Sequence, residues 1–286
     1  MDAPGKTRDL LPSAPRIEAP KGGGAIRGIG EKFQANPVTG TAGFTVPIAL
    51  SPGRNGFQPN LALSYDSGSG NGIFGLGWSL SIPSVKRKTD KGLPRYRDAT
   101  DGDTFVLSEA EDLVPWSDRT GSAEDDGVTY ATRWYRPRVE GAFARIERWT
   151  HPTSGEVHWR TRTRDNVLRV YGQTSQARVA DPDKTSRVFE WLLEEEQDEL
   201  GNVVRYAYET VTLPDAGIYS KGRKLAGNTP TYTYPKRVFY GNVTSGTGDG
   251  GFYFEVVLDY GEHTTDTRDA VGTAATRLDP FSRYRS

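Results

Sequence analysis

The sequence predicts an all-β protein, with many antiparallel hairpins arranged in a curved sheet. Short runs of Val, Ile, Leu, Phe, Tyr and Trp are interrupted so often by Gly, Pro, Asn and Ser that no helix of ordinary length fits between them. Several runs alternate apolar and polar residues with a period of two, as strands do. Hydrophobic residues make up only 35% of the 286 residues while aromatic residues reach 11%, a balance expected for a β-rich shell with a wet inner surface.

The first part of the chain predicts a leader followed by short strands. Residues 1–24 are rich in Pro and Gly and are expected to be flexible, because they offer little to bury against the entropy lost on ordering. An alternating run covers 43–50. Leu61 to Tyr65 and Trp78 to Ile82 then predict an antiparallel pair with a long connection rich in Gly, Ser and Asn.

Charged and polar segments beyond these strands are expected to be loops. Residues 84–100, with Lys86-Arg87-Lys88, predict a solvated basic loop before a strand at 104–107. Asp101-Gly102-Asp103 predicts a turn, because Asp-x-Asp lacks the remaining ligands of a calcium loop. The acidic stretch 118–127 predicts a flexible loop or an insertion.

The second half predicts longer hairpins. Residues 142–149 and 156–162 form a candidate hairpin in which Trp149 and Trp159 can meet across the two strands. Residues 213–235 are rich in Gly, Pro and Lys and predict a long loop.

A further hairpin is predicted around Gly201-Asn202, which can adopt a positive φ angle and turn the chain. The strand 187–196 precedes this turn. After the turn, Tyr206 and Tyr208 project from the same face because they are two residues apart in a strand. The last predicted strand covers 252–260.

Taken together, a series of short motifs resembles the amino-terminal domain of the Salmonella virulence-plasmid 65 kDa B protein (SpvB) family, which is also the start of the B component of Tc insecticidal toxin complexes. The hairpin of residues 198–209 is similar to an RHS or YD repeat. The resemblance is dense from about residue 11 to 116 and looser beyond. The motifs that carry it are KGGGAIRGIG at 21–30, NPVTGT at 36–41, VPI at 46–48, SPGRNGF at 51–57, LALSYDSG at 61–68, NGIFGLGWSL at 71–80 and DGDTFVL at 101–107.

The resemblance implies one all-β domain over residues 25–286, with a looser, RHS-like second half from about residue 130. Proteins that resemble this chain continue past its last residue, so we expect a domain cut from, or a truncated copy of, something longer. The implied architecture is part of an RHS-type β-cocoon, a hollow shell that holds a cytotoxic domain.

The resemblance also implies a non-catalytic role in a secreted bacterial toxin or virulence protein. An RHS-containing toxin C component, and through it a toxin cargo, is the implied partner, with the A-component channel as a further candidate. The family's ADP-ribosyltransferase lies in a separate carboxy-terminal domain. The chain is expected to be cytoplasmic before export and then extracellular.

Composition excludes several classes of function. The 36 basic and 37 acidic residues nearly cancel, so the overall charge points neither to nucleic acid nor to an anionic membrane. The absence of cysteine excludes disulfides and thiolate chemistry. No apolar run at 1–20 is long enough for a classical signal peptide, and no membrane span is predicted.

The residues suggest no catalytic, cofactor-binding or metal site, and no cofactor is expected. Gly70 to Gly75 match G-x-G-x-x-G, but a strand and Pro83 follow where a dinucleotide site needs a helix. The histidines at 151, 158 and 263 lack the spacing of zinc ligands.

Two alternative functions remain open at this stage. Glu194 and Glu196 form a literal Glu-x-Glu, the carboxylate pair of an ADP-ribosyltransferase, but no Ser-Thr-Ser strand precedes them. The other alternative is a β-sandwich that presents three tryptophans to a glycan or a receptor, namely Trp134, Trp149 and Trp159.

Overall fold

The computed structural model describes residues 32–36, 40–98, 102–108, 112–139, 141, 143–212, 219–220, 223–224, 231–244 and 251–260. Strands dominate this part of the chain, and all paired strands are antiparallel, which confirms the all-β prediction. The predicted leader at 1–24 lies outside the described residues.

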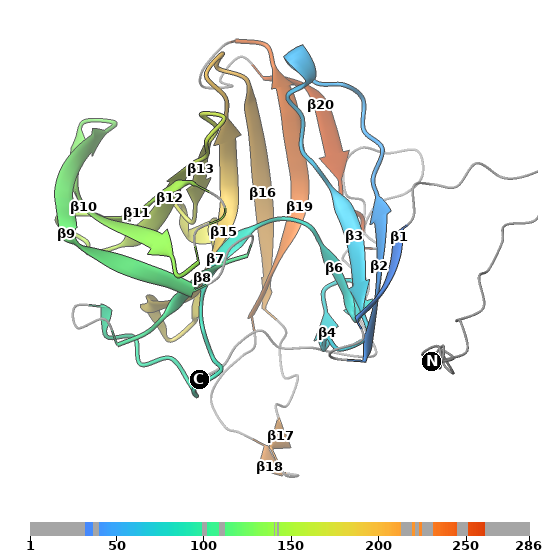
Figure 1. Cartoon of the computed structure of the whole chain (residues 1–286), viewed down its shortest axis with the longest axis horizontal. Helices are drawn as coiled ribbons and strands as arrows, with labels where there is room; N and C mark the ends of the chain where they lie inside the picture. Colours follow the sequence, from blue (N-terminus) through green and yellow to red (C-terminus); the bar gives the residue numbers. More distant parts are fainter. Residues whose placement is uncertain are drawn as a thin grey trace, which may run out of the picture.

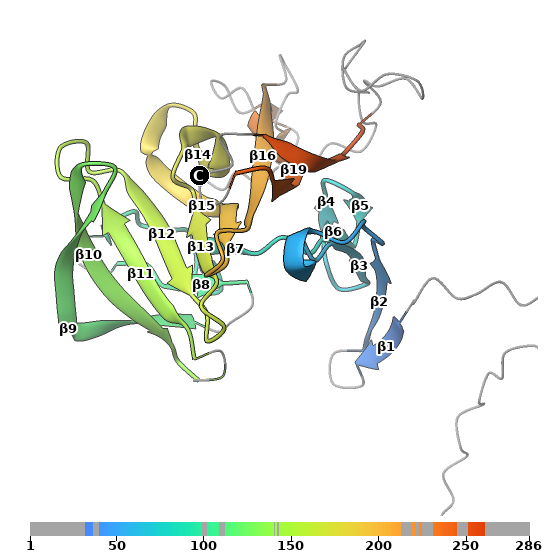
Figure 2. The ribbon, with the colours of Figure 1, turned by 90° about the horizontal axis from the view of Figure 1, so that it is seen from above.

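Eight strands close into a barrel (Figures 1 and 2). Each strand pairs with the next around the ring, and β13 then pairs with β15, which also pairs with β7 and completes the circle. The sequence predicted a curved sheet but not its closure into a barrel. The barrel strands are β7 (Ser84–Arg87), β8 (Phe105–Leu107), β9 (Asp112–Asp125), β10 (Val128–Pro137), β11 (Arg145–Thr150), β12 (Val157–Arg162), β13 (Leu168–Tyr171) and β15 (Lys184–Gln197).

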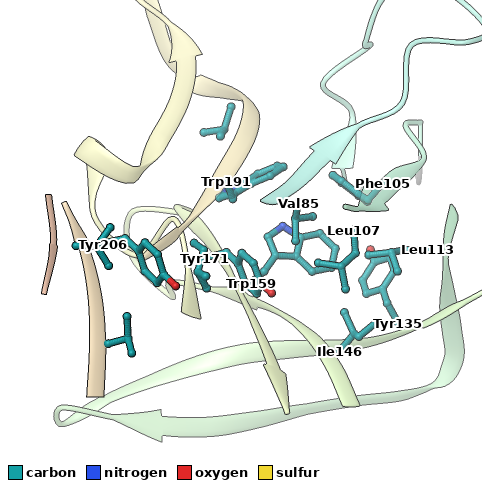
Figure 3. Packing of buried hydrophobic residues seen from close by; sticks show 14 of the residues in the cluster. Val85, Phe105, Leu107, Leu113, Tyr135, Ile146, Trp159, Tyr171, Trp191 and Tyr206 are labelled. Carbon is teal, nitrogen blue, oxygen red and sulfur yellow. The ribbon is translucent and has the colours of Figure 1, made fainter. Parts of the chain in front are cut away.

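Aromatic side chains fill the barrel (Figure 3). The ring centroid of Phe105 lies 4.9 Å from that of Trp159 and 5.8 Å from that of Trp191. All three side chains are buried. Gly172 permits this packing, because its φ is +62° and a Cβ atom there would lie 2.5 Å from Trp191 Cδ1.

The barrel sheet continues outward from β15. Strand β15 pairs with β16, β16 with β19 and β19 with β20, so these strands and the barrel share one twelve-stranded sheet that also includes β14. The short 3₁₀ turn η3 precedes β14, and β17 pairs only with β18. The bounds are η3 (Ser175–Ala177), β14 (Arg178–Asp181), β16 (Val203–Thr212), β17 (Tyr219–Ser220), β18 (Arg223–Lys224), β19 (Thr231–Asn242) and β20 (Phe252–Val257).

A second sheet of four strands lies beside this extension, on the side away from the β9–β10 hairpin (Figures 1 and 2). Its strand order is β1-β2-β3-β6, and the register places Tyr65 opposite Trp78, which confirms the predicted pair. The bounds are β1 (Lys32–Asn36), β2 (Thr41–Pro47), β3 (Ala62–Asp66) and β6 (Trp78–Leu80), with η1 (Arg54–Gly56) between β2 and β3.

Three predicted loops are wrong over part of their range, because strands of the large sheet cover residues in each of them. The start of 84–100 is the barrel strand β7, where Arg87 is only 2% exposed and forms ion pairs with Asp98 and Asp103. Most of 118–127 belongs to β9, and only Asp126-Gly127 turns the chain, both with positive φ. Residues 231–235 begin β19 instead of ending a loop.

The predicted contact between Trp149 and Trp159 is also wrong. The register of β11 and β12 pairs Trp149 with His158, and Trp159 with Arg148. Side chains alternate between the two faces of a strand, so the offset of one residue sends the two indoles to opposite faces. Trp159 enters the barrel, whereas Trp149 packs against His158 with ring centroids 5.5 Å apart.

Candidate interaction surfaces

Glu194 and Glu196 are held by donors of the chain itself. The Thr174 backbone N–H donates to Glu194 at 3.0 Å. Glu196 accepts from Arg169 Nε at 2.8 Å and from the Tyr206 hydroxyl at 2.6 Å. Burial, together with the charge of Glu196, raises the pKa of Tyr206 well above its usual range. Through these hydrogen bonds, both glutamates connect strand β15 to neighbouring strands and turns.

The glycine-rich motif forms a small hairpin. Strand β4 (Asn71–Gly72) pairs with β5 (Gly75–Leu76), and β6 follows directly. The motif therefore lacks the helix amino terminus that would hold a pyrophosphate. The β4 strand of the hairpin lines a cavity of about 740 Å³, and Ser84 and Glu190 also line it. The Ser84 hydroxyl donates to Glu190 at 2.6 Å.

The two described histidines have structural partners, and the part of the chain that the structure describes holds no cluster of metal ligands. His151 Nδ1 accepts backbone N–H groups in the β11–β12 turn. His158 is buried, and Arg160 Nε donates to its Nε2 at 3.1 Å. Burial, reinforced by the nearby Arg160 charge, lowers the pKa of His158 to about 3. His263 lies outside the described residues.

The repeat-like hairpin is confirmed at β15 and β16. The side chain of Asp198 accepts N–H bonds from Leu200 and Asn202 and so fixes the turn. After the turn, the Tyr206 hydroxyl donates to Glu196 and the Tyr208 hydroxyl to the Leu193 carbonyl, both at 2.6 Å. Both tyrosines thus tie β16 back to β15.

The three tryptophans proposed for ligand binding do not form one platform. Trp159 is fully buried in the barrel, and Trp149 is only 6% exposed. Trp134 lies on the outer face, but the guanidinium carbons of Arg145 and Arg119 already lie 4.3 and 5.0 Å from its ring centroid. A sugar ring therefore finds no common aromatic surface here.

Arginine and tryptophan instead alternate on the outside of the barrel. Arg119 also lies over Trp116, 4.4 Å from the ring centroid, and Arg136 lies 5.5 Å from the same ring. We call this surface the Arg–Trp face, made of Trp116, Arg119, Trp134, Arg136 and Arg145 from β9, β10 and β11. The sequence-based predictions did not include this surface, although the arginine-rich and aromatic composition of β10 was the available signal.

The last strand of the large sheet presents a second surface. Strand β20 pairs with β19 on one side, and its other edge has no partner among the described strands. Leu258 N donates to the Lys236 carbonyl, so by alternation the Val257 N–H points away from β19. We call this unpaired side the β20 edge.

Comparison with known proteins identifies the family. The family model described as "Salmonella virulence plasmid 65kDa B protein" matches residues 36–286. The chain belongs to the SpvB family. A curated family member, the mono(ADP-ribosyl)transferase SpvB of Salmonella typhimurium, is 32% identical over 93% of this chain, and the match covers 47% of that protein. The chain thus spans about half the length of the SpvB proteins it matches.

Solved structures extend the SpvB comparison to toxin complexes. The crystal structure of TcdB2–TccC3 superposes on 95% of this chain with a TM-score of 0.75 and 32% identity, and the match covers 14% of that larger chain. The N-terminal domain of the effector SpvB from Salmonella typhimurium strain LT2 superposes on 83% of this chain and 80% of its own, with a TM-score of 0.71 and 32% identity. The predicted resemblance to SpvB and to Tc toxin components is confirmed.

Among the described residues, no helix is long and apolar enough to cross a membrane.

Proposed function

We propose that this SpvB-family chain is a structural, non-catalytic part of a secreted bacterial toxin or virulence protein. It forms one portion of the wall of a β-shell that encloses the cytotoxic domain of an RHS-containing C component. Such a shell separates an aggregation-prone chain from other molecules until it is delivered.

The similarity to TcdB2–TccC3 carries this proposal, because it extends over 95% of the chain while covering only 14% of the larger one. A fold that recurs as a small part of a large assembly is suited to serve as a building unit. The β20 edge supports the same role. An antiparallel sheet with an unpaired edge can be extended by another strand, and a wall can grow in this way.

The environment of the two glutamates favours a structural role over catalysis. The Glu196 carboxylate already accepts hydrogen bonds from Arg169 and Tyr206, and the Glu194 carboxylate accepts one from the Thr174 backbone N–H. A glutamate that must polarise a ribose needs a free carboxylate facing an open site. In a folded sample we therefore expect no NAD hydrolysis above the background rate. The substitution Glu196→Gln should leave that background rate unchanged.

Co-expression with an RHS-containing C component from the same genome tests the shell directly. We expect the two chains to co-elute in gel filtration and a segment of the C component to resist limited proteolysis only in the complex. The same C component expressed alone is the control. A well-folded chain that elutes separately, with the cargo segment cleaved as fast as in the control, would contradict the proposal.

A further inference from the structure

One end of the barrel gathers cations and exposed apolar side chains in the same place. Arg136 lies near the end of β10, and Arg138 directly follows that strand. Arg119 lies over the indoles of Trp116 and Trp134. Val139 and Phe143, in the connection between β10 and β11, are 62% and 68% exposed. The β9–β10 hairpin forms the flank of the molecule farthest from the four-stranded sheet (Figures 1 and 2).

The positive charge of this surface is not neutralised within the described residues. Arg145 forms an ion pair with Glu147. The exposed arginines 119, 136 and 138 have no carboxylate partner in the described part of the chain. Asp118 and Glu140 are the nearby acids whose side chains are not described. The four described arginines thus face one described glutamate.

We propose that this surface docks on an anionic phospholipid bilayer. Arg119, Arg136 and Arg138 would bind lipid phosphates, while Val139 and Phe143 enter the boundary between headgroups and acyl chains. Cations near an anionic bilayer and apolar side chains that reach its interface strengthen peripheral binding together. Tryptophan at such a boundary is favourable because its ring is apolar and its N–H is polar.

Other anionic partners fit the surface less well. Nucleic acids that bind aromatic side chains need ring faces on which bases can stack. Guanidinium groups already lie over both indoles of the Arg–Trp face. An acidic peptide or a nucleic acid also offers no apolar phase for Phe143. A bilayer accommodates the charged and the apolar groups at once.

Vesicle co-sedimentation of the whole chain tests the proposal, without any C component. Vesicles of phosphatidylcholine with about 30% phosphatidylserine provide the anionic surface, and phosphatidylcholine alone is the neutral control. We expect binding to the anionic vesicles only, weakened when salt rises from about 0.05 M to about 0.3 M.

Substitutions then locate the surface. The double variant Arg119→Gln/Arg136→Gln should weaken binding on the order of 25-fold, since each arginine near an anionic bilayer contributes roughly a fivefold factor. Phe143→Ser should weaken it about tenfold. The matched controls are Arg54→Gln/Arg164→Gln and Leu93→Ser, which change exposed residues elsewhere and should bind as the parent chain does. Circular dichroism checks that every variant is folded.

Several results would overturn the inference. A folded chain that does not sediment with anionic vesicles excludes the surface, as does binding that the double variant leaves unchanged. Equal binding to neutral vesicles removes the role of the arginines. Equal affinity for a single-stranded oligonucleotide or polyglutamate, with Phe143→Ser unaffected, would make the surface a general anion binder. None of these outcomes depends on whether the chain joins a shell.

Discussion

Arginine residues in this protein have two different structural roles, and the role of each depends on whether its side chain is buried or exposed. Arg87 is 2% exposed and holds Asp98 and Asp103, so it organises the interior. Arg119 lies over two indoles on the outer face, so it shapes a surface. The sequence places both in polar surroundings, and only the strand pairing distinguishes them.

His158 should make the fold sensitive to acid. Its pKa of about 3 in the fold lies below the ordinary value of 6.5, so the fold favours the neutral ring. The resulting stability is complete above about pH 6.5 and is lost as the pH falls toward 3. At pH 4 we expect a loss on the order of 3 kcal/mol from this residue.

Urea unfolding at pH 7, 5.5 and 4 measures this effect. His158→Gln retains an acceptor for Arg160 and cannot titrate, so its unfolding free energy should fall less over this range than that of the parent chain. Parallel pH profiles for the parent and His158→Gln would refute the assignment.

At the scale of elements, hydrogen bonds from side chains connect the β15–β16 hairpin to the neighbouring strand β19. Asn242 ends β19 and is 1% exposed. Its Oδ1 accepts the Val203 N–H at 2.8 Å, and its Nδ2 donates to the Gly201 carbonyl at 2.9 Å. One amide thus joins the β15–β16 turn to β19.

Asn242→Ala should destabilise the chain by about 2–4 kcal/mol, because it removes the side-chain partner of three backbone groups at a buried position, the third being the Thr244 carbonyl. Chemical unfolding measures the change in free energy. Gln173→Ala, which removes an exposed amide bonded to Asp125 at 3.3 Å, is the control and should change stability by less than about 0.5 kcal/mol. Similar losses of unfolding free energy in the two variants would show that the Asn242 hydrogen bonds do not stabilise the fold.

On the scale of the whole molecule, the described strands form a closed barrel, whereas the extension of the same sheet through β16, β19 and β20 has no further described strand beyond β20. Closure leaves the barrel without an edge, whereas β20 ends its sheet with backbone donors and acceptors that another strand can use. A unit with a closed barrel on one side and the β20 edge on the other can be extended by another strand, as the wall of a shell requires.

Val257→Pro tests whether the β20 edge joins the shell. The substitution removes an N–H that points away from β19, so the fold should lose little stability while co-elution with the C component falls at least tenfold. Val257→Thr keeps the N–H and should behave as the parent chain. Unchanged co-elution of Val257→Pro would place the contact elsewhere on the molecule.

The sequence by itself determined the all-β class, the SpvB resemblance and the local hairpins at β3–β6 and β15–β16. These features follow from a period of two, from turn residues and from ordered motifs, all of which act between near neighbours in the chain. The β15–β16 turn shows this well, because Asp198 and Asn202 sit within one turn and bond each other directly.

Only the tertiary structure decided how the barrel closes and what its faces carry. The β13–β15 pairing, the burial of Arg87 and the opposite faces of Trp149 and Trp159 depend on register between strands. A shift of one residue reverses every side chain, and local patterns do not fix that shift. For the same reason a nearly neutral chain can gather arginines on one face, where the net charge of −1 gives no hint of them.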